Sequence, residues 1–121
     1  MTQQTNLHRF RSFSTSLDII RSLQPLCARL RRVDTSLTKQ LRTAATSISL
    51  NLAESRGRVG KDRLHFFRIA AGSAEEVAAA LLVAEAWGYL SESDIAEALD
   101  HVEHVRAMLQ RLLPGGHAPA R

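Results

Sequence analysis

The sequence predicts an all-α protein, folded as an antiparallel up-down four-helix bundle, and three observations support this prediction. Apolar residues recur every three or four positions along four segments, as they do on one face of a helix, and no segment shows the alternation of a strand. Residues that can cap a helix precede the second and fourth segments, and Gly or Pro follows the second, third and fourth. The connections are short, which favours antiparallel neighbours.

A chain of 121 residues is long enough for one hydrophobic core but not for two. We therefore expect one bundle over residues 14–113, with flexible tails at 1–13 and 114–121. No apolar run reaches about 18 residues, so no membrane span is expected. The N-terminal residues lack the apolar stretch of a signal peptide, which favours a cytoplasmic location. The single cysteine, Cys27, has apolar neighbours, which favours a buried structural thiol over a nucleophile.

The first helix is expected over residues 14–32, where Pro25 predicts a kink or a break. Its apolar face comprises Leu17, Ile20, Leu23, Cys27 and Leu30. The second helix is expected to begin near Asp34 or Ser36, either of which can cap it. Gly57 follows its end, where a left-handed residue is typical. Its apolar face comprises Leu37, Leu41, Ala44, Ile48 and Leu52.

The third helix is expected over residues 61–87 and ends before Gly88. Its segment VAAALLVA, residues 77–84, is apolar around the whole circumference, which is typical of a helix buried on more than one side. This pattern favours a homo-oligomer, although alanines are also tolerated on a helix surface. The predicted interface residues are Val77, Leu81, Leu82 and Val83.

The fourth helix is expected to follow Ser91 and to end before Pro114. Its inward residues are predicted to be Ile95, Leu99, Val102, Leu109 and either Leu112 or Leu113.

Charge is unevenly distributed along the chain. Residues 1–68 contain thirteen Lys and Arg against four Asp and Glu, whereas residues 69–121 contain three against eight. A basic half attracts polyanions, nucleic acid above all. Alternatively, the two halves neutralise each other in the fold or across a subunit contact.

Two basic clusters are candidates for nucleic-acid binding. Arg56, Arg58, Lys61 and Arg63 lie in a glycine-containing turn that can approach a phosphate backbone. The other cluster, Arg29, Arg31 and Arg32, ends the first helix, where basic residues also complement the helix dipole. In an up-down bundle these clusters lie at opposite ends, so they are not expected to form one site.

A polar stripe runs along the edge of the second and third helices. Ser47, Asn51 and Glu54 share one face of the second helix, and Ser73 and Glu76 share one face of the third. We expect these five side chains to form a structural hydrogen-bonded network, with Arg42, Arg58 or Arg68 as donors to the carboxylates. Such a network fixes helix pairing more than it adds stability.

The sequence predicts no enzyme, metal or cofactor. Di-iron bundles need Glu-x-x-His on two helices, and the chain has none. His101 and His104, with Glu97 or Asp100 nearby, can offer part of a metal site, but a solvated helix face is the simpler interpretation. No catalytic grouping of Ser or Cys with His is apparent.

The stretches LRTAATSISLNLAESRGR and FFRIAAGSAEEVAAALLVAEAWGYL resemble a known pattern. It is that of bacterial four-helix-bundle proteins encoded in intervening sequences of large-subunit ribosomal RNA genes. The matching positions are Ser47-Ile48, Asn51-Leu52-Ala53-Glu54, Gly57-Arg58, Phe66-Phe67, Ile69-Ala70, Gly72-Ser73, Glu76 and Gly88-Tyr89-Leu90. Ser49 and Ser55 stand where the family often has Pro and Gly, and Ala71 replaces a residue that is often basic.

The resemblance implies a non-enzymatic bundle that assembles into a homopentameric barrel. A related branch, the accessory variability proteins of diversity-generating retroelements, binds nucleic acid together with a reverse transcriptase. We therefore expect an oligomer that binds RNA or another nucleic acid, with RNA favoured over DNA, through a basic surface. The alternative is an assembly or protein-interaction module without nucleic-acid binding, including an accessory subunit to a reverse transcriptase.

Overall fold

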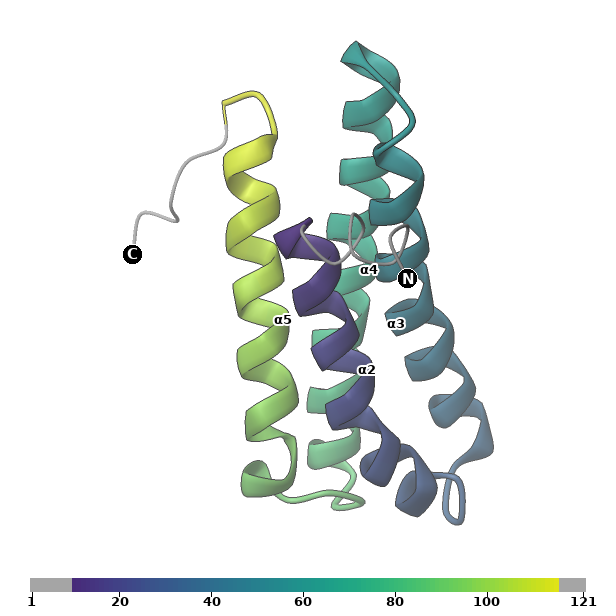
Figure 1. Ribbon diagram of the computed structural model, residues 1–121. Helices are drawn as coiled ribbons and strands as arrows, with labels where there is room; N and C mark the ends of the chain where they lie inside the picture. The colour runs from purple at the N-terminus through teal and green to yellow at the C-terminus, as the bar shows by residue number, and fades with distance from the viewer. Residues whose placement is uncertain (1–9, 116–121) are drawn as a thin grey trace.

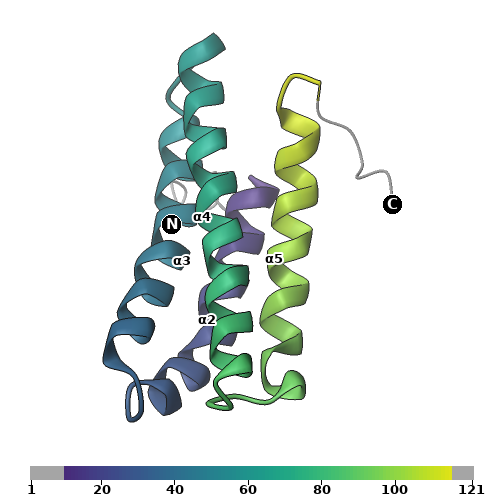
Figure 2. The same ribbon diagram turned by 180° about the vertical axis from the view of Figure 1, so that it is seen from behind.

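The computed structural model describes residues 10–115, and this part of the chain forms four α-helices without a strand. The helices are α2 (Arg11–Leu30), α3 (Thr35–Ser55), α4 (Gly60–Ala86) and α5 (Glu92–Leu112). They run alternately up and down side by side, which confirms the predicted four-helix bundle (Figures 1 and 2). None of these helices combines the length and apolarity needed to cross a membrane.

The helices form a ring in chain order. Close contacts join α2 to α3, α3 to α4, α4 to α5 and α5 back to α2, so α3 and α5 lie across the bundle from each other. The α2–α3 and α4–α5 turns share one end, and the α3–α4 turn lies at the other, where α3 and α4 extend beyond the start of α2 (Figure 1). This arrangement decides which charged residues can act together.

The first helix begins earlier than predicted. Residues 11–13, expected in a flexible tail, form the first turn of α2, because Ser14 N donates to Phe10 O over 3.0 Å and Phe13 packs against the core. The remaining predicted tail residues, 1–9 and 116–121, lie outside the described residues. Pro25 does not break α2, which continues to Leu30.

The other helix ends follow the expected capping chemistry with one exception. Asp34 accepts a bond of 2.9 Å from Leu37 N at the start of α3, and Ser91 forms a reciprocal capping box with Asp94 at the start of α5. Gly88 has the expected positive φ of 81°.

The prediction that Gly57 adopts a left-handed conformation is wrong. After α3 the backbone makes hydrogen bonds between residues three positions apart, from Gly57 N to Glu54 O and from Arg58 N to Ser55 O. The positive φ of 59° falls on Gly60 instead, at the first residue of α4.

The core is built from the inward faces of all four helices. On α2 the buried face is rotated from the predicted one: Ile19 and Leu26 are buried, whereas Leu17 and Ile20 are half-buried. Each buried Leu or Ile contributes about 1.5–3 kcal/mol from removal of its surface from water. The largest fully buried apolar side chains are Ile19, Leu30, Leu41, Ile48, Leu52, Leu81, Ile95, Leu109, Val77, Val102 and Val105.

Candidate nucleic-acid interface

The structure brings together three of the five residues of the predicted polar stripe. Ser73 Oγ on α4 donates to Ser47 Oγ on α3 over 2.8 Å. Asn51 Nδ2 donates to Ser47 O over 2.8 Å and to Ser47 Oγ over 3.0 Å. These half-buried groups join α3 to α4 at the edge of the core.

The two carboxylates of the stripe do not join this network. Glu54 and Glu76 are exposed, and Glu54 accepts from Arg58 Nη2 over 2.6 Å instead of reaching α4. Both carboxylates are therefore hydrated in a single bundle. The expected donors Arg42 and Arg68 make no ion pair within residues 10–115.

A second polar pair lies deeper and was not predicted. Ser16 on α2 and Ser49 on α3 are both buried, and their hydroxyl oxygens are 2.8 Å apart. Ser55 is also fully buried and satisfies its hydroxyl by donating to Leu52 O over 2.6 Å. The available signal was that Ser16 follows the same helical face as Ile19 and Leu23.

The α3–α4 turn holds most of its cations in internal contacts. Arg58 is paired with Glu54 at 2.6 Å and with Asp62 at 3.0 Å, which raises the pKa of its guanidinium. Arg56 lies over the ring of Phe10 and Arg63 over that of Phe67, with 5.3 Å and 5.5 Å to the ring centroids. The cluster therefore offers less free positive charge than its sequence suggests.

The cluster at the end of α2 is also partly engaged. Arg29 Nη2 donates to Asp94 Oδ2 on α5 over 3.0 Å, and this bond with the Ser91 cap holds the pKa of the Asp94 carboxyl well below its usual range. Arg31 and Arg32 are exposed and form no ion pair within residues 10–115. As expected, this cluster and the α3–α4 turn lie at opposite ends of the bundle (Figure 1).

Arg31 lines a groove along the start of α3, which we call the basic groove. Its volume is about 330 Å³, and no carboxylate lines it. The basic groove is lined by Arg31, Thr35, Thr38, Lys39, Arg42 and Thr43. Sequence reasoning missed Lys39 and assigned Arg42 to the polar network. The available signal was that residues 35–53 contain no Asp or Glu.

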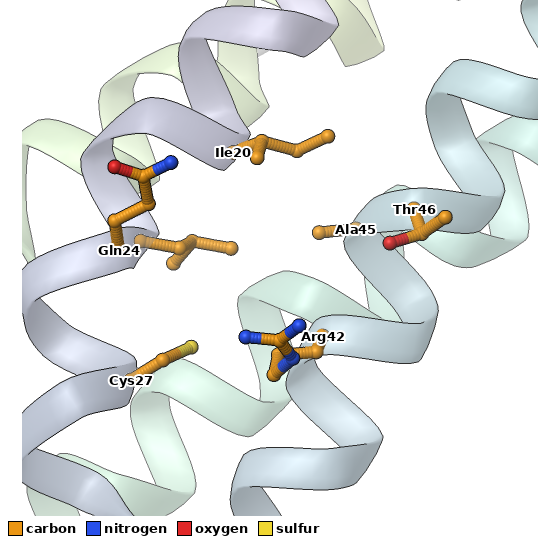
Figure 3. A pocket seen from close by; sticks show the side chains of 7 residues that line it. Ile20, Gln24, Cys27, Arg42, Ala45 and Thr46 are labelled. Carbon is orange, nitrogen blue, oxygen red and sulfur yellow. The ribbon is translucent and has the colours of Figure 1, made fainter.

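A smaller pocket of about 150 Å³ lies between α2 and α3, next to the basic groove. Arg42 from α3 and Cys27 from α2 extend toward one another across it, with Ile20 and Ala45 on its apolar side (Figure 3). Burial raises the pKa of the Cys27 thiol, against the opposing charges of Arg42 and Arg31. Cys27 is 5% exposed, which confirms the predicted buried thiol.

Acidic residues dominate the opposite side of the bundle. Residues 92–103 of α5 contain five carboxylates and no Lys or Arg. The histidines of α5 lie beside two of these, with 3.7 Å from His101 Nε2 to Glu97 and 3.9 Å from His104 Nδ1 to Asp100. In the described part of the chain, no three His, Cys, Asp or Glu residues group as a metal site would require.

The predicted oligomer residues divide into two groups. Val77 and Leu81 are completely buried inside their own bundle, so they are not available to a second copy. Leu82 and Val83 are 53% and 43% exposed. In a single bundle the 77–84 segment is therefore not buried all round, since Ala79, Leu82 and Val83 are exposed.

Comparisons with known proteins agree with this fold. The sequence profile that describes the 23S rRNA-intervening sequence protein matches residues 9–111 of the chain. Comparison with curated proteins gives no match. A crystal structure of a protein of unknown function from the S23 ribosomal protein family of Bacteroides thetaiotaomicron is similar, with a TM-score of 0.76 and 18% identity. The similarity covers 84% of this chain and 97% of that one, and at this identity it supports the fold alone.

Proposed function

This chain belongs to the 23S rRNA-intervening sequence protein family, and we propose that it is a non-enzymatic, homo-oligomeric bundle that binds RNA. The binding is through the phosphate backbone and needs neither a metal nor a cofactor. The observation that carries the proposal is the separation of charge across the bundle. The cations Lys39 and Arg42 lie on α3, whereas the carboxylates of residues 92–103 lie on α5, diagonally opposite.

Charge separation of this kind orients a protein on a polyanion. The α3 side attracts phosphates, and the α5 side is repelled by them, so one side of each bundle faces the RNA. If the two charged sides neutralised each other within the fold, cross-bundle ion pairs would be expected. Among residues 10–115 the ion pairs that join α5 to another helix are those of Arg29 with Asp94 and of Arg106 with Glu75, and neither involves α3. The first of these joins the basic half of the chain to the acidic half, but it leaves the cations of α3 unpaired.

Phosphate contacts fit the side chains better than base reading does. The chain has six aromatic residues, and Phe10, Phe66 and Phe67 lie beneath arginines. Few rings remain to stack on bases, and no base-reading motif is present. The proposed binding therefore depends weakly on sequence and strongly on salt.

Assembly strengthens such binding. Leu82 and Val83 give α4 an exposed apolar face that a second copy can cover. The pentameric barrel implied by the family resemblance repeats the basic side of each bundle around a ring, so that modest single contacts add through multivalency.

The second candidate function is a protein-interaction module. The observation that favours it is the exposure of Leu82 and Val83 near the end of α4 and of Trp87 directly after it, which a protein partner can cover. A reverse transcriptase, as in the related retroelement branch, is one such partner.

Fluorescence anisotropy with a labelled single-stranded RNA tests the proposal. The purified protein should bind at about 50 mM salt, and binding should weaken steeply toward about 200 mM. A DNA strand of the same sequence serves as the comparison and should show a similar salt dependence, because its backbone carries the same phosphates. Absence of RNA binding at about 50 mM salt, where phosphate contacts are strongest, would reject the proposal in favour of the interaction module.

A further inference from the structure

Building on the proposed function, we infer that the basic groove at the corner of α2 and α3, and not the α3–α4 turn, holds the phosphodiester backbone of the RNA. The basic groove presents three cations and three threonine hydroxyls in one concavity. The three cations and the exposed hydroxyls of Thr35 and Thr43 can donate hydrogen bonds to phosphate oxygens. The buried hydroxyl of Thr38 instead donates to Asp34 O over 2.8 Å. A protein partner would in addition require apolar anchors, and the basic groove has none.

The cations of the basic groove are free to meet a ligand. Within residues 10–115, none of Arg31, Lys39 and Arg42 forms an ion pair. The nearby carboxylate of Asp34 is occupied as the cap of α3, where it accepts from Leu37 N. By contrast, Arg58 in the α3–α4 turn has two carboxylate partners, which an arriving phosphate would have to displace.

The arrangement along α3 suits a chain of phosphates better than a single one. Thr35, Lys39 and Thr43 follow each other at intervals of four residues, and therefore form one row along the helix. Arg42 lies beside this row and also lines the next groove along α3, with Thr46 and Ser47. From Thr35 to Thr46 the helix rises by about 16 Å, which is long enough for several successive phosphates of one strand.

The positive end of α3 adds to the same field. Thr35 is the first residue of α3, so the partial positive charge of the helix N-terminus lies at the groove, where the capping carboxylate of Asp34 offsets part of it. Arg31 follows the end of α2, across the turn from α3. The charges of Arg42 and Arg31 both act to lower the pKa of the nearby Cys27 thiol. Cations from the end of α2 and from α3 therefore lie together in the basic groove.

The test compares two triple variants that remove equal charge. Arg31→Gln, Lys39→Gln and Arg42→Gln together neutralise the basic groove. Arg56→Gln, Lys61→Gln and Arg68→Gln neutralise exposed cations on the turn and on α4. All six positions are exposed, so both proteins should fold, which circular dichroism and light scattering verify.

The groove triple should lower the RNA affinity at about 50 mM salt by at least tenfold, and should reduce the slope of log affinity against log salt by about 2. The turn triple should change both quantities much less. Arg42→Lys, which keeps the charge, should retain the wild-type slope. An equal or larger effect of the turn triple would overturn the assignment to the basic groove while leaving RNA binding intact.

Two further outcomes are distinguishable. If the wild type does not bind RNA at all, both the basic groove and the proposed function are rejected. Inorganic phosphate, titrated by calorimetry at constant ionic strength, should give no saturable binding at concentrations where RNA saturates the protein. Saturation by inorganic phosphate in that range would identify the groove as a site for a free phosphate group and overturn the backbone assignment.

Discussion

The hydroxyl of Ser73 on α4 donates to the hydroxyl of Ser47 on α3 over 2.8 Å, and the same oxygen of Ser47 accepts from Asn51. One acceptor therefore satisfies two donors at the edge of the core. This arrangement fixes how far α3 can slide along α4, because a shift of one residue would separate the hydroxyls.

Ser47→Ala should destabilise the bundle more than Ser73→Ala does. It leaves two donors without this acceptor, which costs about 0.5–1.5 kcal/mol for each bond in such a half-buried position. Ser36→Ala, at an exposed position of α3 without a side-chain hydrogen bond in the described structure, should change stability little. Urea unfolding followed by circular dichroism measures these differences. Equal midpoints for Ser47→Ala and Ser36→Ala would contradict the structural role of the pair.

Leu82→Glu should split the proposed oligomer without unfolding the bundle. The side chain is 53% exposed in a single bundle, so a carboxylate there is hydrated in the monomer but buried in an assembly that covers α4. Light scattering at tens of micromolar, above a dissociation constant of about a micromolar, reports the change. Val33→Glu provides the control, since Val33 is 58% exposed but lies in the α2–α3 turn. A wild type that is monomeric under these conditions would remove the basis for the interface.

Asp94→Asn should lower the thermal midpoint of unfolding at neutral pH. In acid, the difference between the variant and the wild type should disappear. The pKa of Asp94 is held below its ordinary value by Arg29 and the Ser91 cap. Its contribution to stability is therefore fully present above the unfolded pKa near 4, and is lost as the pH falls through the lower folded pKa. Melting curves of both proteins should converge as the pH falls below about 4. As the control, Asp100→Asn, on the exposed face of the same helix, should change the thermal midpoint at neutral pH much less. If the midpoint of Asp94→Asn stayed below that of the wild type by the same amount at all pH values, the ion pair would be contradicted.

Cys27 should resist thiol reagents in the folded protein. The side chain is 5% exposed and burial raises its pKa, so little thiolate is available near neutral pH. Reaction with a chromogenic disulfide should be slow in buffer and rapid in denaturing urea. Rapid reaction of the native protein would show that the pocket between α2 and α3 opens in solution.

Much of the fold follows from local patterns that a sequence displays directly. Asp34 and Ser91 start their helices, and Gly88 ends α4, because capping chemistry acts between residues that are close in sequence. Gly57 was assigned the wrong conformation because the turn contains a second glycine, Gly60, and local rules do not choose between them.

The site was less predictable because side chains choose partners across helices. Arg58 was expected either to bind nucleic acid or to donate to a carboxylate of the polar stripe. It lies one turn after Glu54 and one turn before Asp62, and binds both. Ser49 stands where the family often has Pro, and its hydroxyl contacts that of Ser16, which is 33 positions away in the chain.

The sequence by itself determined the four helices, their caps and the uneven distribution of charge, since each depends on neighbours within a few positions along the chain. Only the tertiary structure decided which cations pair with carboxylates and which stay available to a ligand. Arg29 is paired with Asp94 from a distant helix, whereas Arg31 joins Lys39 and Arg42 in the basic groove. The physical reason is that an ion pair forms at about 4 Å, and which charges come that close is set by the packing of the core, not by their order in the chain.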